Sequence, residues 1–158
     1  HPDNDERAIF FCKGVLETVK KLGWSPDIVH CNDWMTSLIP MYLKTTYKND
    51  PIFKHTKTVF TVYNSFFQHK FDEQDLMDKV RMIDIEDGML SHLKTADYAA
   101  FLRTGMAYAD VVIKAEERFN DKLNQLFEEF NEKKINFIEP NDDKFSDSYY
   151  NLYNELFN

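Results

Sequence analysis

The residues best suited to chemistry follow a short apolar segment early in the chain. Residues 28–31 have strand-forming character, and Asn32, Asp33 and Trp34 come directly after them. A carboxylate and an amide can hold sugar hydroxyls, while an aromatic ring can cover the apolar face of a sugar. The same spacing also permits a structural interpretation, in which Asp33 caps the following helix and Trp34 belongs to the core.

A second group of polar side chains accompanies residues 58–63, the clearest strand in the sequence. Tyr63, Asn64 and Gln68 lie at or beyond its end, although Asn64 is also a favoured turn residue. Ligands of an open parallel α/β sheet bind beyond the carboxyl ends of its strands. We therefore expect Asp33, Trp34 and Asn64 to meet in one sugar-sized hollow.

His30 raises the question of a metal centre. Asn32 and Asp33 are close to it in sequence, but no second histidine or cysteine pair lies at ligand spacing. We therefore expect neither a metal ion nor a cofactor. Cys12 and Cys31 stand among apolar neighbours and are predicted to be buried free thiols.

Helices and strands alternate along the chain, which predicts an α/β fold with a Rossmann-like parallel sheet and flanking helices. Three strands make a thin sheet, so the fold is expected to be incomplete at the N-terminus, with further strands upstream of His1 and an exposed edge or apolar face. Residues 1–135 are expected to form the Rossmann-like part, and residues 136–158 an acidic loop and C-terminal helix. The stretch 64–90 is the least periodic. Predicted helices cover residues 5–22, 34–47, 96–109, 116–134 and 146–157, and predicted strands cover 28–31, 58–63 and 111–114. Because Pro40 is tolerated only near the first turn, the regular part of the second helix is expected to start near Thr36 or Ser37.

The composition argues against several classes of protein. Of the 158 residues, 43% are hydrophobic and 15% aromatic, which disfavours disorder, and a net charge of −8 disfavours a nucleic-acid partner. With 4 glycines, the chain cannot assemble a Gly-rich phosphate loop. No apolar segment approaches the length of a membrane span and no signal peptide is visible. We expect a cytoplasmic location and no membrane partner.

Several motifs resemble those of bacterial glycogen/starch synthases. Residues 24–34, WSPDIVHCNDW, are similar to the family pattern G-W-x-P-D-(I/V)-(I/V)-H-x-H-D-W. Residues 38–43 resemble L-x-P-x-Y-L, and residues 59–64 resemble V-F-T-(V/I)-H-N. Residues 104–110 resemble K-x-G-L-x-Y-A-D, and residues 3–7 also fit the family. Because the motifs occur in family order, the chain is identified as a member, similar to the N-terminal catalytic domain.

The resemblance implies a retaining glycosyltransferase of the GT-B type, with two Rossmann-like domains and a cleft between them. In this family glucose passes from ADP-glucose or UDP-glucose to an α-1,4-glucan in glycogen biosynthesis. A C-terminal Rossmann domain or a partner chain would complete the site, so this chain alone is not expected to complete a catalytic cycle. The resemblance assigns catalytic roles to Asp33, Asn64 and Tyr63, and substrate-binding roles to His30, Asn32, Trp34 and Gln68.

Departures from the family pattern keep a second hypothesis open. Tyr63 and Asn32 stand where the family has histidines, and residues 113–119 replace the family's T-V-S-P-x-Y-A. The family's Lys-x-Gly-Gly donor loop is not in this chain, and the acidic tail ending at Asn158 is typical of a natural terminus. The alternative is a degenerate, non-catalytic module that binds glucan or a nucleotide sugar.

Overall fold

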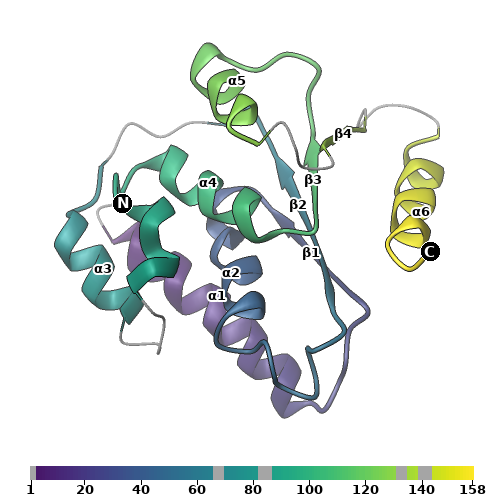
Figure 1. The fold of residues 1–158 in the computed structure, drawn as a ribbon, viewed down its shortest axis with the longest axis horizontal. Helices are drawn as coiled ribbons and strands as arrows, with labels where there is room; N and C mark the ends of the chain where they lie inside the picture. The colour runs from purple at the N-terminus through teal and green to yellow at the C-terminus, as the bar shows by residue number, and fades with distance from the viewer. Residues whose placement is uncertain (1–2, 66–69, 82–86, 131–134, 139–143) are drawn as a thin grey trace.

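The computed structural model describes residues 3–65, 70–81, 87–130, 135–138 and 144–158. At its centre is a sheet of four parallel strands in the order β1-β2-β3-β4 (Figure 1). The predicted α/β class with a Rossmann-like parallel sheet is confirmed. The strands are β1 (Ile28–Asn32), β2 (Lys57–Val62), β3 (Val111–Lys114) and β4 (Ile135–Phe137).

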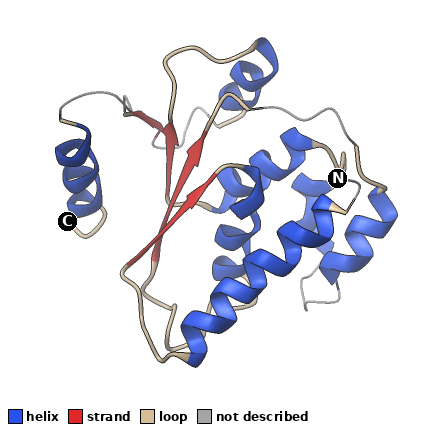
Figure 2. Cartoon of the chain, turned by 180° about the vertical axis from the view of Figure 1, so that it is seen from behind, coloured by secondary structure: helices blue, strands red, loops and turns tan. Residues whose placement is uncertain are grey.

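The helices divide unequally between the two faces of the sheet. On one face lie α1 (Asn4–Lys21), the 3-10 helix η1 (Trp34–Thr36), α2 (Leu38–Lys44) and α4 (Tyr98–Tyr108). On the other face, among the described residues, lies α6 (Phe145–Glu155), and the two views agree on this (Figure 1, Figure 2). The α6 side is therefore the thinner of the two apolar layers.

Strand β2 is buried on both faces, as a strand inside a parallel sheet must be. Phe60 belongs to the larger core beneath α4, and Val59 belongs to the smaller core beneath α6. Gly105 in α4 lies directly over the Phe60 ring, since a Cβ at Gly105 would come within 2.6 Å of the ring carbon Cζ. The glycine of the 104–110 motif thus permits close packing of helix on sheet.

The helix expected over residues 116–134 is much shorter in the structure. Asn120 is extended and its side-chain oxygen accepts a hydrogen bond from the Leu123 backbone at 3.0 Å, so α5 covers only Asp121–Glu128. Strand β4 follows at a place where no strand was predicted. It is the fourth strand of the sheet and spans Ile135–Phe137. The boundary expected between residues 135 and 136 falls within this strand, and the division of the chain into two parts stays a prediction.

Two other expectations also need correction. The helix expected over residues 34–47 is split into η1 and α2, and Pro40 is the third residue of α2, where a proline costs no helical hydrogen bond. The stretch 64–90, expected to be irregular, contains α3 (Glu73–Arg81), and the 3-10 helix η2 (Asp87–Leu93) begins within it. Lys79 of α3 pairs with Asp5 of α1 at 3.0 Å and fixes α3 against the domain.

The two cysteines follow the sequence interpretation. Cys12 and Cys31 are free and buried, and burial raises the pKa of the Cys12 thiol to about 12. No helix in the described part of the chain is long and apolar enough to cross a membrane. Phe10 and Trp24 are exposed large hydrophobic residues.

Candidate functional site

Asp33 stands at the carboxyl end of β1 with its side chain held from two sides. Its Oδ1 accepts a hydrogen bond from the Tyr98 hydroxyl at 2.9 Å, and its Oδ2 accepts a short hydrogen bond from the Ser65 hydroxyl. The Asp33 amide donates to the Thr61 carbonyl at 2.8 Å, which ties the turn to β2. Asp33 is therefore positioned by two segments that are distant in sequence, the end of β2 and α4.

The backbone of Asp33 is in the left-handed region, with φ of 58°. A non-glycine residue in this region stores strain, and such residues gather at functional sites. Asp33 precedes η1, yet its side chain makes no capping hydrogen bond to that helix. The Asp33 carboxylate therefore does not cap the following helix, which was the structural interpretation of this residue.

Tyr98 is a part of this cluster that the sequence interpretation missed. Its ring is buried, and its hydroxyl lies 2.8 Å from that of Ser65 and 2.9 Å from the Asp33 carboxylate. Burial raises the pKa of Tyr98, and the neighbouring Asp33 carboxylate raises it further. The phenol stays protonated at neutral pH and can donate its hydrogen. In the sequence, Tyr98 is simply the first residue of a helix capped by Asp97, and nothing in its neighbourhood indicates a site.

Asn64 and Tyr63 diverge at the end of β2. The Asn64 side-chain oxygen accepts hydrogen bonds from the backbone and side chain of Asn120 at 3.2 and 3.0 Å. The backbone amide of Asn64 donates to the Glu116 carboxylate at 2.9 Å. Tyr63 instead donates to the Asn32 side-chain oxygen at 3.3 Å. Asn64 is thus tied to the N-terminus of α5, while Tyr63 turns toward β1.

A cavity of about 530 Å³ opens between the strand ends and α6. His30, Asn32 and Tyr63 line one side of it. The His30 ring shares hydrogen bonds through Nδ1 with Tyr153 at 2.6 Å and through Nε2 with Thr61 at 2.7 Å. The other lining residues come from α6 and are Phe145, Ser146, Tyr149, Tyr150 and Tyr153.

Burial lowers the pKa of His30, so its ring is neutral at neutral pH. Both ring nitrogens already have protein partners, which makes His30 a link between β1, β2 and α6. Among the described residues, no cluster of three or more histidines, cysteines or carboxylates could hold a metal ion.

The remaining predicted site residues are less informative. Trp34 is partly buried, and its ring meets the edge of Phe101 at a centroid distance of 5.9 Å on the α4 side. Gln68 lies outside the described residues. The structure thus brings Asp33, Tyr63 and Asn64 to one edge of the sheet but directs their side chains to different neighbours.

Asp110, the acidic residue of the 104–110 motif, has a structural role. It accepts hydrogen bonds from the Lys44 ammonium at 2.8 Å and from the Thr58 amide and hydroxyl at 2.7 and 2.9 Å. Burial alone would raise the pKa of Asp110, but Lys44 and Thr58 hold it below the usual value. Asp110 joins α2, β2 and the start of β3.

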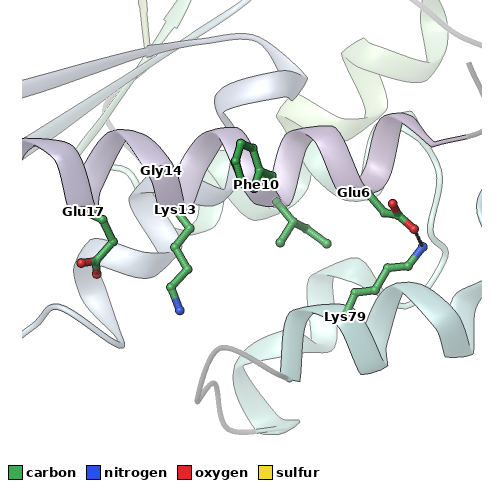
Figure 3. A pocket seen from close by; sticks show the side chains of 7 residues that line it. Glu6, Phe10, Lys13, Gly14, Glu17 and Lys79 are labelled. Carbon is green, nitrogen blue, oxygen red and sulfur yellow. Dashed lines mark ion pairs between the residues drawn. The ribbon is translucent and has the colours of Figure 1, made fainter.

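A further hollow of about 440 Å³ lies along α1. Phe10, Lys13 and Glu17 border it on α1, and Lys79 reaches it from α3, where it pairs with Glu6 (Figure 3). None of the predicted site residues lines it.

A parallel sheet flanked by helices, with polar side chains gathered where two adjacent strands end, defines a Rossmann-like α/β domain with its candidate site in the usual position. Comparison with known proteins makes the class specific. The family model described as starch synthase catalytic domain matches residues 1–134. The chain therefore belongs to this family, and the resemblance read from the motifs is confirmed.

Individual relatives agree with the family match. Glycogen synthase of Thermotoga maritima is 40% identical over 137 residues, which cover 84% of this chain and 26% of that protein. Glycogen synthase of Desulforudis audaxviator is 41% identical over 112 residues, which cover 70% of this chain and 22% of that protein. Glycogen synthase of Clostridium botulinum is 32% identical over 182 residues, with coverage of 98% of this chain and 38% of that protein. The chain spans about a quarter of the length of the first two.

Proposed function

We propose that this chain is part of a glucosyltransferase of the glycogen/starch synthase type, which transfers glucose from ADP-glucose or UDP-glucose to an α-1,4-glucan. The observation that supports the proposal most strongly is the Asp33 carboxylate, strained in backbone and held by Tyr98 and Ser65 where β1 ends. A carboxylate fixed in this way can accept hydrogen bonds from sugar hydroxyls in one orientation.

Transfer of glucose breaks a glycosyl–phosphate bond, so positive charge develops on the sugar and negative charge on the leaving diphosphate. Asp33 would orient the glucose unit and face the developing positive charge, and it would not act as a nucleophile. Tyr98 and Ser65 are positioning residues, because they act through Asp33. Tyr63 and Asn64 would border the same glucose unit. The nucleotide would depend on a further Rossmann domain or a partner chain.

Incorporation of labelled glucose into glycogen tests this function. The complete gene product is incubated with glycogen and either labelled ADP-glucose or labelled UDP-glucose, which also identifies the donor. Asp33→Asn keeps the size of the side chain and removes its charge, and we expect the rate to fall by about 10²- to 10³-fold. The matched control is Asp27→Asn, an exposed aspartate before β1, which should leave the rate unchanged. An Asp33→Asn variant as fast as the wild type would refute the role.

A second candidate is a module that binds glucan without turnover. Tyr63 in place of the family histidine and a neutral His30 with both nitrogens engaged support it. Retention of the protein on glycogen with no incorporation from either donor would favour this function over the first.

A further inference from the structure

The solvent face of α1 carries a line of residues with a regular spacing. From Asp3, which precedes the helix, the line continues in alternating steps of four and three residues. This is the spacing of the a and d positions of a coiled coil, which follow one line along a helix. The buried residues Ala8, Cys12 and Leu16 lie on the opposite side of α1. The line, called here the α1 stripe, consists of Asp3, Arg7, Phe10, Gly14, Glu17 and Lys21.

The centre of the α1 stripe is an exposed ring beside an open position. The side chain of Phe10 is 82% exposed. A Cβ at Gly14, one turn further along, would have no atom within 4 Å. The hollow of about 440 Å³ lies at this point, with Gly14 in its lining and Lys79 of α3 at its border (Figure 3). An aromatic ring from another molecule can therefore pack against the backbone of α1.

The order of residue types along the stripe is self-complementary. When two copies of α1 lie antiparallel about a two-fold axis at position 12, residues equally far on either side of that position meet. The pairs are Phe10 with Gly14, Arg7 with Glu17, and Asp3 with Lys21. The first joins a ring to an open position, and the other two join opposite charges. In such an isologous interface each contact occurs twice.

The distribution of charge along α1 favours the antiparallel direction. The first turn of the helix is acidic and its last turn is basic. In an antiparallel pair the basic end of one copy lies against the acidic end of the other, and the two helix dipoles also oppose each other. A parallel pair would bring Arg7 against Arg7 and Glu17 against Glu17, and like charges at an interface are costly. The charges therefore fit a second copy in one orientation.

The contacts that Arg7 and Glu17 already make hold both side chains and leave them able to bind a partner. Asp3 accepts a hydrogen bond from Nε of Arg7 at 2.9 Å, and a guanidinium has further N–H donors at its two terminal nitrogens. Oε1 of Glu17 accepts a short hydrogen bond from the Tyr47 hydroxyl, and a carboxylate can accept through both oxygens. Part of the side-chain entropy lost on association is thus already lost in the single chain.

We propose that the α1 stripe is an interface between two copies of this chain, in which Phe10 of each copy packs over Gly14 of the other. At 1.5 Å per residue and a helix width of about 10 Å, the stripe covers roughly 270 Å². Stable interfaces bury about 800 Å² per partner, so the dimer should be weak and reversible, with a dissociation constant of about 10–100 µM.

The proposed dimer does not involve the candidate site. None of the six stripe residues, all of which the structure describes, lines the cavity near His30. Both copies can therefore keep their strand ends accessible. The interface is independent of the proposed function, because it depends only on the residues of α1.

Sedimentation velocity of the complete gene product, from about 1 µM to about 1 mM, tests the interface. The wild type should pass from monomer to dimer. Arg7→Glu and Glu17→Arg should each stay monomeric, because either change places like charges together twice. An equimolar mixture of the two variants should dimerise again, since both pairs in a mixed dimer have opposite charges. Circular dichroism checks that each variant is folded.

A second pair of variants tests the ring. Phe10→Ala should weaken dimerisation at least about tenfold, because two rings are lost from each dimer. Phe157→Ala is the matched control, since Phe157 is 54% exposed near the C-terminus and away from α1, and it should dimerise as the wild type does.

Each result supports or overturns the proposal. A wild type that stays monomeric at the highest concentration overturns it, as when another segment of the gene product covers the stripe. Dimerisation that neither Arg7→Glu nor Phe10→Ala weakens also overturns it, since the interface would then lie elsewhere. A mixture of folded charge variants that remains monomeric contradicts the antiparallel pairing. Loss of glucose transfer by the wild type would leave the interface unaffected.

Discussion

Replacing Asp110 by asparagine tests whether a motif residue of the family serves the fold. In the native protein one carboxylate oxygen of Asp110 accepts hydrogen bonds from the Thr58 amide and hydroxyl, and the Lys44 ammonium contacts both oxygens at 2.8 and 3.0 Å. Asparagine can still accept from Thr58, but its NH₂ group cannot pair with Lys44. The side chains of Lys44 and Asp110 are 37% and 27% exposed, so water screens part of the ion pair.

The magnitude follows from the contacts that are lost. Hydrogen bonds to charged groups contribute about 1.5–3 kcal/mol, and after allowance for screening we expect Asp110→Asn to lower the free energy of unfolding by about 2 kcal/mol. For a protein of this size that corresponds to a fall in Tm of roughly 4–8 °C. Urea denaturation at neutral pH measures the change, and Asp27→Asn, an exposed aspartate, is the control with no expected effect.

The pH dependence gives the prediction a sign. The pKa of Asp110 in the folded state is below the ordinary aspartate value of 3.8, so the unfolded state takes up a proton first as the pH falls. The stabilisation is therefore complete above about pH 5 and is lost as the pH falls through the folded-state pKa. The difference between wild type and Asp110→Asn should shrink below pH 3.8. Equal urea midpoints at neutral pH, or a difference that does not change with acid, would refute the reasoning.

Two further predictions concern packing and the thiols. Gly105→Ala should destabilise the protein by about 1–3 kcal/mol, because the new methyl group meets the Phe60 ring at 2.6 Å. Gly14→Ala in α1 is the matched control, because a Cβ there would have no atom within 4 Å, and it should raise the stability by about 0.5–1 kcal/mol. Thermal unfolding compares the two variants. A Gly105→Ala protein as stable as the wild type would show that helix and sheet pack less closely than described. Cys12 and Cys31 should react with a thiol reagent only after urea is added, since burial raises the pKa of both. Fast reaction of either cysteine in the native protein would contradict their burial.

The fold class could be predicted because its signals are local. The apolar segments that became β1, β2 and β3 are dense in β-branched residues, and the alternation with helices implied parallel pairing. Strand β4 was missed because only three residues pair in it, too few for a periodic pattern. The helix over residues 116–134 was predicted too long because only the apolar spacing was considered. The capping side chain of Asn120, which sets the start of α5, was not taken into account.

The site could be predicted only in part, for a physical reason. Motif order pointed to Asp33 and to the end of β2, and the position at the carboxyl ends of strands followed from topology. Tyr98 and Ser65 come from segments whose approach to Asp33 depends on tertiary packing. Sequence spacing carries no signal for such contacts.

The most direct test of the central claim is the rate of glucose transfer by Tyr98→Phe. This variant deletes one oxygen, the donor to Asp33 Oδ1, and keeps the buried ring. If Tyr98 positions a carboxylate that orients glucose in the transition state, kcat should fall about tenfold or more while KM for glucan stays near the wild-type value. Unchanged kcat in the Tyr98→Phe protein would contradict the claim.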